Sequence, residues 1–286
     1  MGPITRVSVI STGQVRIRPQ HERSNGTPLA WWLFTSRTWT APRPINVYVI
    51  EHEKGLVLFD TGQDRHSVTD SDYFPGGMAR LPYRRLARFE IEPNETLTAQ
   101  LGGLGYAPGD VMVAVLSHLH QDHIGGLPEL TGTRILVGAA EWASLDAPMP
   151  ELNGLMRNHI RIPGLKWEQV EFGPLGDESL QPFESGHDLF GDGSLVLLPT
   201  PGHTPGSLSL LLRQDGLAPM LFVGDLTYDI HLFDDDHVPG VGRRRDLLAS
   251  TQRVKALRDA QPGLIVAAAH DPGAADAVCK AVDVSF

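Results

Sequence analysis

One short segment of the chain carries four side chains that can bind metal ions. Residues 118–123 read HLHQDH and directly follow the apolar run at 111–116. Imidazole nitrogens and carboxylate oxygens crowded in this way cannot form an apolar core, because each buried polar group left unpaired costs about 1–3 kcal/mol. A bound cation removes that cost, so the segment predicts a metal site just after a strand.

The spacing within this segment indicates two ions. In extended backbone, residues two apart point the same way, so His118 and His120 can meet one ion as a pair. His123 is adjacent to Asp122 and shares its direction only if the chain turns, which a following glycine such as Gly125 permits. Asp122 and His123 are then available to a second ion.

Three further ligand candidates lie downstream, and each follows an apolar run. His203 lies at the centre of the Pro/Gly-rich segment PTPGHTPG, Asp225 follows MLFVG, and His270 follows LIVAAA. Strand ends that each present one ligand are typical of a site at one edge of a sheet, where rigid strands position loop residues. The full candidate set is His118, His120, Asp122, His123, His203, Asp225 and His270.

The order of these residues resembles that of the metallo-β-lactamase superfamily. H-x-H-x-D-H is followed by a lone His in a Pro/Gly-rich loop, then Gly-Asp, then a lone His near the C-terminus. Residues 59–62, FDTG, resemble the family's early Asp-Thr-Gly turn, so the likeness spans nearly the whole chain. It implies an α/β fold, a four-layer αββα sandwich with two metals at one end of the sheets, and a single domain over residues 1–286.

The resemblance also implies a role for each ligand. His118, His120 and His203 would hold one metal, Asp122, His123 and His270 the other, and Asp225 would bridge the two. The single cysteine, Cys279, lies outside every motif. Imidazole and carboxylate ligands suit zinc, the first expectation, and also iron, cobalt or manganese. Asp60 of the Asp-Thr-Gly turn either accepts a hydrogen bond from a ligand histidine, on the side away from the metal, or caps a turn.

Four features narrow the branch of the superfamily. Asp225 is present, whereas the family's true β-lactamases usually lack this carboxylate; His120 stands where flavin-linked diiron oxygen reductases typically carry Glu. Only residues 271–286 follow the last ligand, which we expect to be too short for the helical domain of glyoxalase II enzymes. Tyr228, three residues after Asp225, resembles the tyrosine that reaches the substrate carbonyl in N-acyl homoserine lactonases.

This resemblance implies a quorum-quenching lactonase. A hydroxide bridging the two metals would attack the lactone carbonyl of an N-acyl homoserine lactone, with Tyr228 stabilising the oxyanion and Asp122 shuttling a proton to the leaving alkoxide. Two alternatives stay open. The same dinuclear hydrolase could act on another lactone, an ester or a thioester, or the chain could be a catalytically silent metal-binding protein.

Composition bounds the partners and the compartment. Lys+Arg 24 against Asp+Glu 34 gives a net charge of -10, which disfavours nucleic acid because phosphate backbones attract basic surfaces. One cysteine suits a reducing compartment. The N-terminus lacks the pattern of a signal peptide, and no apolar stretch approaches the roughly 20 residues that cross a bilayer. We therefore expect a cytoplasmic protein that binds a small acyl lactone and neither nucleic acid nor membrane.

The periodicity predicts several elements that would position these motifs. We expect a strand at 4–13, a hairpin at 45–60, a helix at 95–104 capped by Asn94, and a helix bearing Leu247, Leu248, Val254 and Leu257. Residues 14–44 and 63–93 are expected to be long loops. Segments 45–138 and 194–268 are expected to form two strand-rich halves.

Trp31 and Trp32 are notable outside the ligand set. Three uses compete: a substrate-binding wall for an acyl chain, a homodimer contact, and plain packing on the sheet. The remaining histidines lack a strand-end context and are expected at the surface or in loops. These are His21, His52, His66, His159, His187, His231 and His237.

Overall fold

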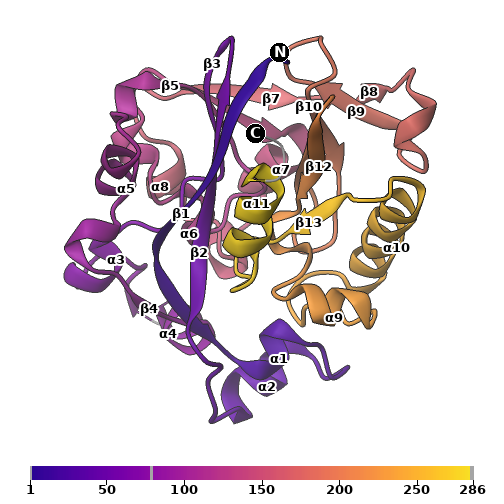
Figure 1. The fold of residues 1–286 in the computed structure, drawn as a ribbon. Helices are drawn as coiled ribbons and strands as arrows, with labels where there is room; N and C mark the ends of the chain where they lie inside the picture. The colour runs from indigo at the N-terminus through magenta and orange to yellow at the C-terminus, as the bar shows by residue number, and fades with distance from the viewer. Residues whose placement is uncertain (1, 78–79, 284–286) are drawn as a thin grey trace.

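The computed structural model describes residues 2–77 and 80–283, and it contains two β-sheets packed face to face (Figure 1). The first sheet is seven-stranded, in the order β4 (Ala87–Glu90), β1 (Ile4–Ile17), β2 (Arg43–His52), β3 (Gly55–Phe59), β5 (Val111–Val115), β6 (Arg134–Gly138), β7 (Lys166–Val170). The second is six-stranded, in the order β13 (Ile265–Ala267), β12 (Leu217–Phe222), β11 (Leu208–Gln214), β10 (Leu195–Pro199), β9 (Ser185–Asp188), β8 (Gly173–Pro174).

The helices of the described residues are mostly short, and they flank or connect the strands. They are α1 (Pro19–Glu22), α2 (Leu29–Thr35), α3 (His66–Thr69), α4 (Arg80–Leu86), α5 (Leu97–Gly103), α6 (Gln121–Ile124), α7 (Ala139–Ala143), α8 (Arg157–Ile160), α9 (Ile230–Asp234), α10 (Arg244–Ala260) and α11 (Ala274–Asp283).

Alternating side chains explain why the two sheets stack. In β5, Val113 and Val115 point into the core between the sheets, whereas Ala114 points to the outer face. In β10, Leu195 and Leu197 point inward. Since successive side chains of a strand point to opposite faces, strands that are apolar throughout must be covered on both faces.

Helices provide the outer cover. Leu97 and Leu101 of α5 pack on the outer face of the first sheet, and Leu247, Val254 and Leu257 of α10 pack on the outer face of the second. Helix, sheet, sheet and helix therefore form four layers, and the predicted αββα sandwich is confirmed.

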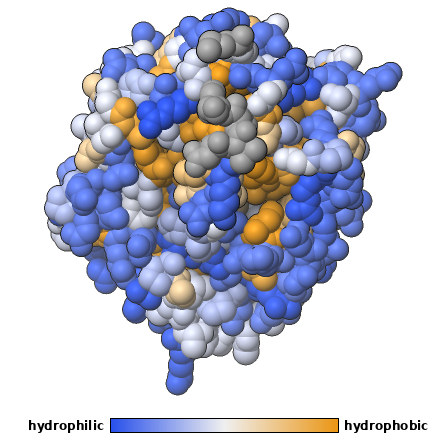
Figure 2. All heavy atoms as spheres, in the orientation of Figure 1, coloured by the Kyte–Doolittle hydropathy of each residue, from blue (hydrophilic) through white to orange (hydrophobic). Residues whose placement is uncertain are grey.

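Helix α11 closes one side of the sandwich by contacting both sheets. It lies against β1 of the first sheet and against β12 and β13 of the second. Figure 2 shows hydrophobic atoms gathered on both sides of this helix, on a face that is otherwise largely hydrophilic.

Several sequence expectations hold, and others need correction. The hairpin is confirmed, because β2 and β3 pair antiparallel and turn between His52 and Gly55. The helix predicted at 95–104 begins at Leu97, and its cap is Thr96, whose side chain accepts from the backbone N–H of Ala99. Asn94 lies instead in a separate 3-10 turn, Pro93–Glu95.

The two long segments predicted as loops contain regular structure. Residues 14–44 include the end of β1, which runs four residues past its predicted end to Ile17, and helices α1 and α2. Residues 63–93 include α3, α4 and β4. The end of β1 is a strand because it pairs with β4, a non-local contact that periodicity cannot reveal.

The topology brings the predicted ligands to one edge. The segment 118–123 follows β5 of the first sheet, and His203, Asp225 and His270 follow β10, β12 and β13 of the second. β12 and β13 pair parallel. β10 and β12 both pair antiparallel with β11, so β10 runs in the same direction as β12 and β13. Their carboxyl ends therefore share one edge.

Gly125 allows α6, which carries Asp122 and His123, to dock on the loop after β3. The Gly125 N–H donates to the Gly62 carbonyl at 2.6 Å, and a Cβ at Gly125 would lie 2.0 Å from the backbone nitrogen of Asp64. Gly125→Ala should therefore lower the free energy of unfolding by about 1–3 kcal/mol, measured by urea titration. Gly102→Ala is the control, because its methyl group would meet no atom within 4 Å; an equal loss in both variants would contradict this account.

Candidate metal centre

The seven predicted ligands converge at the shared edge of the sheets. Three groups of their ligand atoms lie within 4.8 Å of one another and could each hold a metal ion. The groups are His118, His120 and His203; Asp122, His123 and His270; and His118, His123 and Asp225. The first two groups have the membership that the resemblance implied for two separate ions.

Asp225 lies between these two groups and faces both. Its Oδ1 is 3.3 Å from His123 Nε2 and 3.4 Å from His270 Nε2. Its Oδ2 is 3.5 Å from His203 Nε2, which itself lies 3.0 Å from His120 Nδ1. One carboxylate thus offers one oxygen to each side, the arrangement required of a bridging ligand.

The chemistry of these atoms fits metal ions. Four of the predicted ligand atoms are buried without a hydrogen-bond partner in the described residues: His118 Nε2, His123 Nε2, His270 Nε2 and Asp225 Oδ1. Leaving each of them unpaired costs about 1–3 kcal/mol, and a cation would satisfy them together. Nitrogen and oxygen donors of this kind are the ones that zinc and other first-row metals take.

The other ring nitrogen of most of these histidines is occupied by a second partner. His120 Nε2 lies 3.1 Å from the Asn153 carbonyl, and His270 Nδ1 lies 2.9 Å from the Pro44 carbonyl. His118 Nδ1 lies 3.0 Å from the Ser117 hydroxyl. Such contacts fix the tautomer and the ring orientation, and they leave the opposite nitrogen free for a metal.

Asp60 provides the same support for His123. Its Oδ2 lies 2.8 Å from His123 Nδ1, and its two oxygens accept from the N–H and the hydroxyl of Ser117 at 2.7 and 2.9 Å. Of the two roles predicted for Asp60, the hydrogen bond to a predicted ligand histidine is the one observed. Its backbone has φ 62, an unusual conformation for a residue other than glycine.

Burial and charge set the protonation of the cluster. Burial lowers the pKa of His203 to about 3 and that of His118 well below its usual value, so both rings are neutral. At His123 burial acts downward, but the carboxylates of Asp60 and Asp225 outweigh it and raise the pKa. At Asp225 burial acts upward, and the charges of His270 and His123 outweigh it and lower the pKa. The cluster is thus polarised about an ionised Asp225.

Tyr228 stands next to the predicted bridging carboxylate. Its hydroxyl donates to Asp225 Oδ2 at 2.6 Å, and its ring stacks on His270 with centroids 5.3 Å apart. Burial first, and then the charge of Asp225, raises the pKa of Tyr228 well above its usual value. The hydroxyl therefore keeps its proton and remains a hydrogen-bond donor at neutral pH.

One histidine expected at the surface or in a loop, His52, is buried, and another, the partly exposed His21, adjoins the site. His21, in α1, is half-buried with its Nε2 3.0 Å from the Tyr228 hydroxyl, so it adjoins the site. His52, in β2, is buried with its Nε2 3.0 Å from Ser194 Oγ. No periodicity marks His21, because only tertiary packing brings α1 to Tyr228. The other five, His66, His159, His187, His231 and His237, are exposed or partly exposed as expected.

The tryptophan pair is divided between two environments. Trp32 is 2% exposed, and its ring lies 6.1 Å from that of His21. Trp31 is 65% exposed on the same helix, α2. Trp32 is therefore buried beside His21, whereas Trp31 is exposed to solvent.

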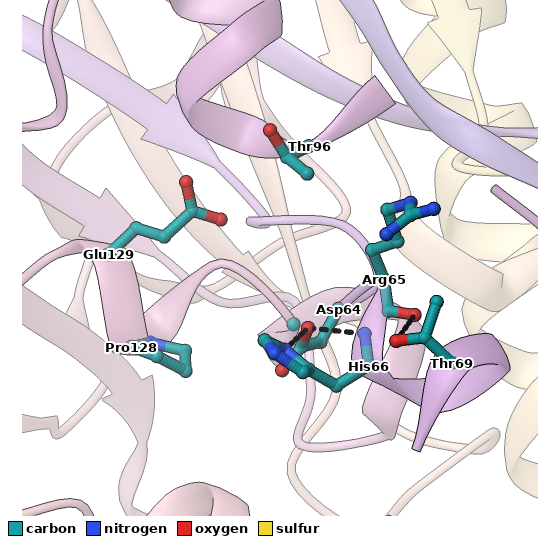
Figure 3. Close-up of a pocket in the computed structure, with 8 residues that line it drawn as sticks. Asp64, Arg65, His66, Thr69, Thr96, Pro128 and Glu129 are labelled. Carbon is teal, nitrogen blue, oxygen red and sulfur yellow. Dashed lines mark hydrogen bonds and ion pairs between the residues drawn. The ribbon is translucent and has the colours of Figure 1, made fainter. Parts of the chain in front are cut away.

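A separate small cavity lies beside α3 and does not include the predicted ligands (Figure 3). Its volume is about 250 Å³. Within it, the Asp64 carboxylate accepts from the His66 N–H and contacts His66 Nδ1, each at 2.8 Å. Its lining residues are Asp64, Arg65, His66, Thr69, Thr96, Gly125, Pro128 and Glu129.

Residues 40–270 match the metallo-beta-lactamase superfamily, with all seven converging side chains inside or at the end of the matched region. The chain belongs to this superfamily. The resemblance predicted from the ligand order is confirmed. Members of the superfamily typically bind metal ions, and the His/Asp cluster provides for them here.

Relatives agree with a hydrolase. The chain is 28% identical to an N-acyl homoserine lactonase of Azorhizobium caulinodans over 233 residues, 81% of this chain and 83% of that protein. It is 33% identical to a probable metallo-hydrolase of Mycobacterium tuberculosis over 245 residues, 79% of this chain and 74% of that protein. The chain is therefore a hydrolase.

A solved structure shares the fold. It is an N-acyl homoserine lactone hydrolase with the product N-hexanoyl-L-homoserine bound at its catalytic metal center. The match has a TM-score of 0.75 at 24% sequence identity and covers 95% of both chains.

Over residues 2–77 and 80–283, no helix is long and apolar enough to cross a membrane.

Asp225→Asn should reduce the metal content of the purified protein, measured by elemental analysis. The substitution removes the negative charge that faces both histidine groups, so binding of either ion weakens. Tyr228→Phe is the matched control, because it removes a neighbour of Asp225 and leaves every ligand atom in place. A metal content in Asp225→Asn equal to that of the wild type would exclude Asp225 as a bridging ligand.

Proposed function

We propose that this chain is a dinuclear metal-dependent hydrolase that opens the lactone ring of N-acyl homoserine lactones, with residues 1–286 forming one domain. The observation that carries this proposal is the Tyr228 hydroxyl, which lies 2.6 Å from the carboxylate that faces both ligand groups. It adds a hydrogen-bond donor for a substrate carbonyl to a complete set of ligands. Relatives named N-acyl homoserine lactonases support the choice of substrate.

The proposed metals are two zinc ions, for which iron, cobalt or manganese could substitute. His118, His120 and His203 would hold one ion, and Asp122, His123 and His270 the other, with Asp225 shared. When bound, such ions supply Lewis acidity and lower the pKa of coordinated water to about 7, which makes a nucleophile available at neutral pH.

Tyr228 would stabilise the charge that develops on the substrate. In the resting protein its proton is donated to Asp225, so the donor is already held at the reacting centre. As the carbonyl oxygen becomes an oxyanion, the hydroxyl can turn to it and donate there instead. A donor positioned before the reaction stabilises the transition state more than the ground state.

Asp122 is the better placed of the two carboxylates to move a proton. Its side chain is 17% exposed, against 4% for Asp225, so it can reach both the cluster and the solvent side. Burial acts to raise its pKa, but the His270 ring, whose Nε2 lies 3.4 Å from Asp122 Oδ2, and the charge of His123 lower it overall. As an ionised carboxylate it could take a proton from the attacking water and pass it to the ring oxygen, which becomes the hydroxyl of the opened product when the ring C–O bond breaks.

The acyl chain of the substrate would lie along α2. Leu29, Trp31 and Phe34 are exposed on this helix by 38%, 65% and 54%. Trp31 and Phe34, three residues apart, share one face of this helix, and Trp32 packs near His21, which contacts Tyr228, so α2 lies beside the site. Exposed apolar side chains gathered in this way indicate a binding surface.

A substrate panel tests the proposed function. Wild-type protein loaded with zinc should hydrolyse acyl homoserine lactones with a higher kcat/KM than simple lactones, aryl esters, a thioester or a cephalosporin. A preference for one of the other classes would assign the same site to that substrate instead. Protein that carries metal but hydrolyses none of them would be a metal-binding protein without turnover.

Tyr228→Phe should lower kcat for the preferred lactone by about 10²–10³, the usual effect of losing one oxyanion donor. The metal content should stay at the wild-type value, because the phenol is not a ligand. Steady-state kinetics on protein of measured metal content separates the two effects. A wild-type kcat in this variant would remove Tyr228 from the reaction.

Trp31→Ala should reduce the preference for long acyl chains over short ones. The indole is exposed, so the substitution removes contact area for the chain with little effect on stability, and KM for decanoyl substrate should rise more than KM for butanoyl substrate. Trp32→Ala is a contrasting variant that should destabilise the fold by about 3–5 kcal/mol. An unchanged length preference in Trp31→Ala, together with loss of a dimer on gel filtration, would assign Trp31 to a subunit contact.

A further inference from the structure

His21 contacts the same Tyr228 hydroxyl that donates to Asp225. The Tyr228 hydroxyl contacts two groups, Asp225 Oδ2 at 2.6 Å and His21 Nε2 at 3.0 Å. The two rings meet edge to face, with centroids 5.3 Å apart. His21 is not among the ligand groups, and the reaction as described so far does not use it.

The direction of the His21 hydrogen bond follows from proton counting. A phenol has one proton, and an ionised carboxylate such as Asp225 can only accept. Since Tyr228 donates that proton to Asp225, the second bond must run from the His21 N–H to the Tyr228 oxygen. His21 Nδ1 is buried and has no hydrogen-bond partner in the described residues, as expected if Nε2 carries the single proton. Burial lowers the pKa of His21 to about 4, so the neutral ring is the form present at pH 7.

Helix α1 is held against the site by contacts from β2 and from the segment after α9. Glu22 pairs with Arg43, whose Nη1 donates to the Tyr228 carbonyl at 2.8 Å. The His21 carbonyl accepts from the Gly240 N–H at 2.9 Å. A Cβ at Gly240 would lie 2.0 Å from the Gln20 carbonyl oxygen, so this close approach requires glycine. One arginine thus fixes both the helix that carries His21 and the backbone of Tyr228.

We propose that His21 is a positioning residue for Tyr228: its N–H holds the phenol oxygen so that the hydroxyl proton always points away from His21 and toward the reacting centre. The proposal rests on the proposed function. In the resting protein the hydroxyl donates its proton to Asp225, and during turnover it would donate to the substrate oxygen. A hydrogen bond donated to the phenol oxygen also polarises the hydroxyl and makes it a stronger donor, because consecutive hydrogen bonds reinforce one another.

A pair of variants of nearly equal shape tests this role. His21→Met removes the N–H, whereas His21→Gln has similar length and keeps an N–H that can reach the phenol oxygen. His21→Met should lower kcat by about tenfold, the effect of one hydrogen bond, with KM little changed, and His21→Gln should recover most of the loss. Equal kinetics in the two variants, at equal thermal stability, would overturn the proposal.

A double-substitution cycle tests whether His21 acts through Tyr228. In a Tyr228→Phe background the phenol oxygen is absent, so His21→Met should cause no further loss of kcat. An undiminished further loss would show that His21 acts independently and would overturn the proposal.

A measurement on metal-free protein separates this proposal from the proposed function. The ¹³Cζ signal of Tyr228, assigned by its absence in Tyr228→Phe, reports the hydrogen bonds of the phenol without any turnover. His21→Met should shift this signal and His21→Gln should return it toward the wild-type position. If the wild type hydrolyses no lactone, the proposed function fails while this comparison still tests the contact. A signal that His21→Met leaves in place would overturn the positioning role whatever the substrate.

Discussion

The structure depends on one electrostatic constraint: several polar atoms are buried around Asp225 with no hydrogen-bond partner in the described residues. Nitrogens of His118, His123 and His270 face one another or a carboxylate oxygen at the edge of the sheets. Such an arrangement is unfavourable unless positive charge is placed among them. The partners on the opposite ring nitrogens, among them Asp60 and the Pro44 carbonyl, hold the rings in this orientation. A metal centre is the physical state for which these side chains are arranged.

The sandwich provides the rigidity that this arrangement requires. Strands that are apolar on both faces are fixed by packing on each side, so the residues at their ends have little freedom to move apart. The predicted ligands at the strand ends of both sheets are therefore held close together. α6 adds Asp122 and His123 by packing on the loop after β3, where Gly125 allows backbone to approach backbone. Stability of the core and geometry of the site are consequently two results of the same packing.

The contacts that support the site come from segments that carry no recognisable motif in the sequence. Arg43, at the start of β2, contacts Glu22 of α1 and the carbonyls of Tyr228 and His270. Through it, a helix of four residues is brought beside a candidate catalytic tyrosine. The proposed reaction thus involves both a ligand set that follows a family pattern and a set of supporting contacts that no sequence motif indicates.

The sequence alone determined the family, because the order and spacing of these residue types have few other physical uses. Through the family resemblance it also predicted the four-layer fold and the ligand set. It also predicted Tyr228, through its offset from Asp225. Tertiary structure alone decided the place of His21, the division between buried Trp32 and exposed Trp31, and the pairing that extends β1 to Ile17. The reason is that these features depend on contacts between residues far apart in the chain. Local periodicity and turn chemistry carry no information about such contacts.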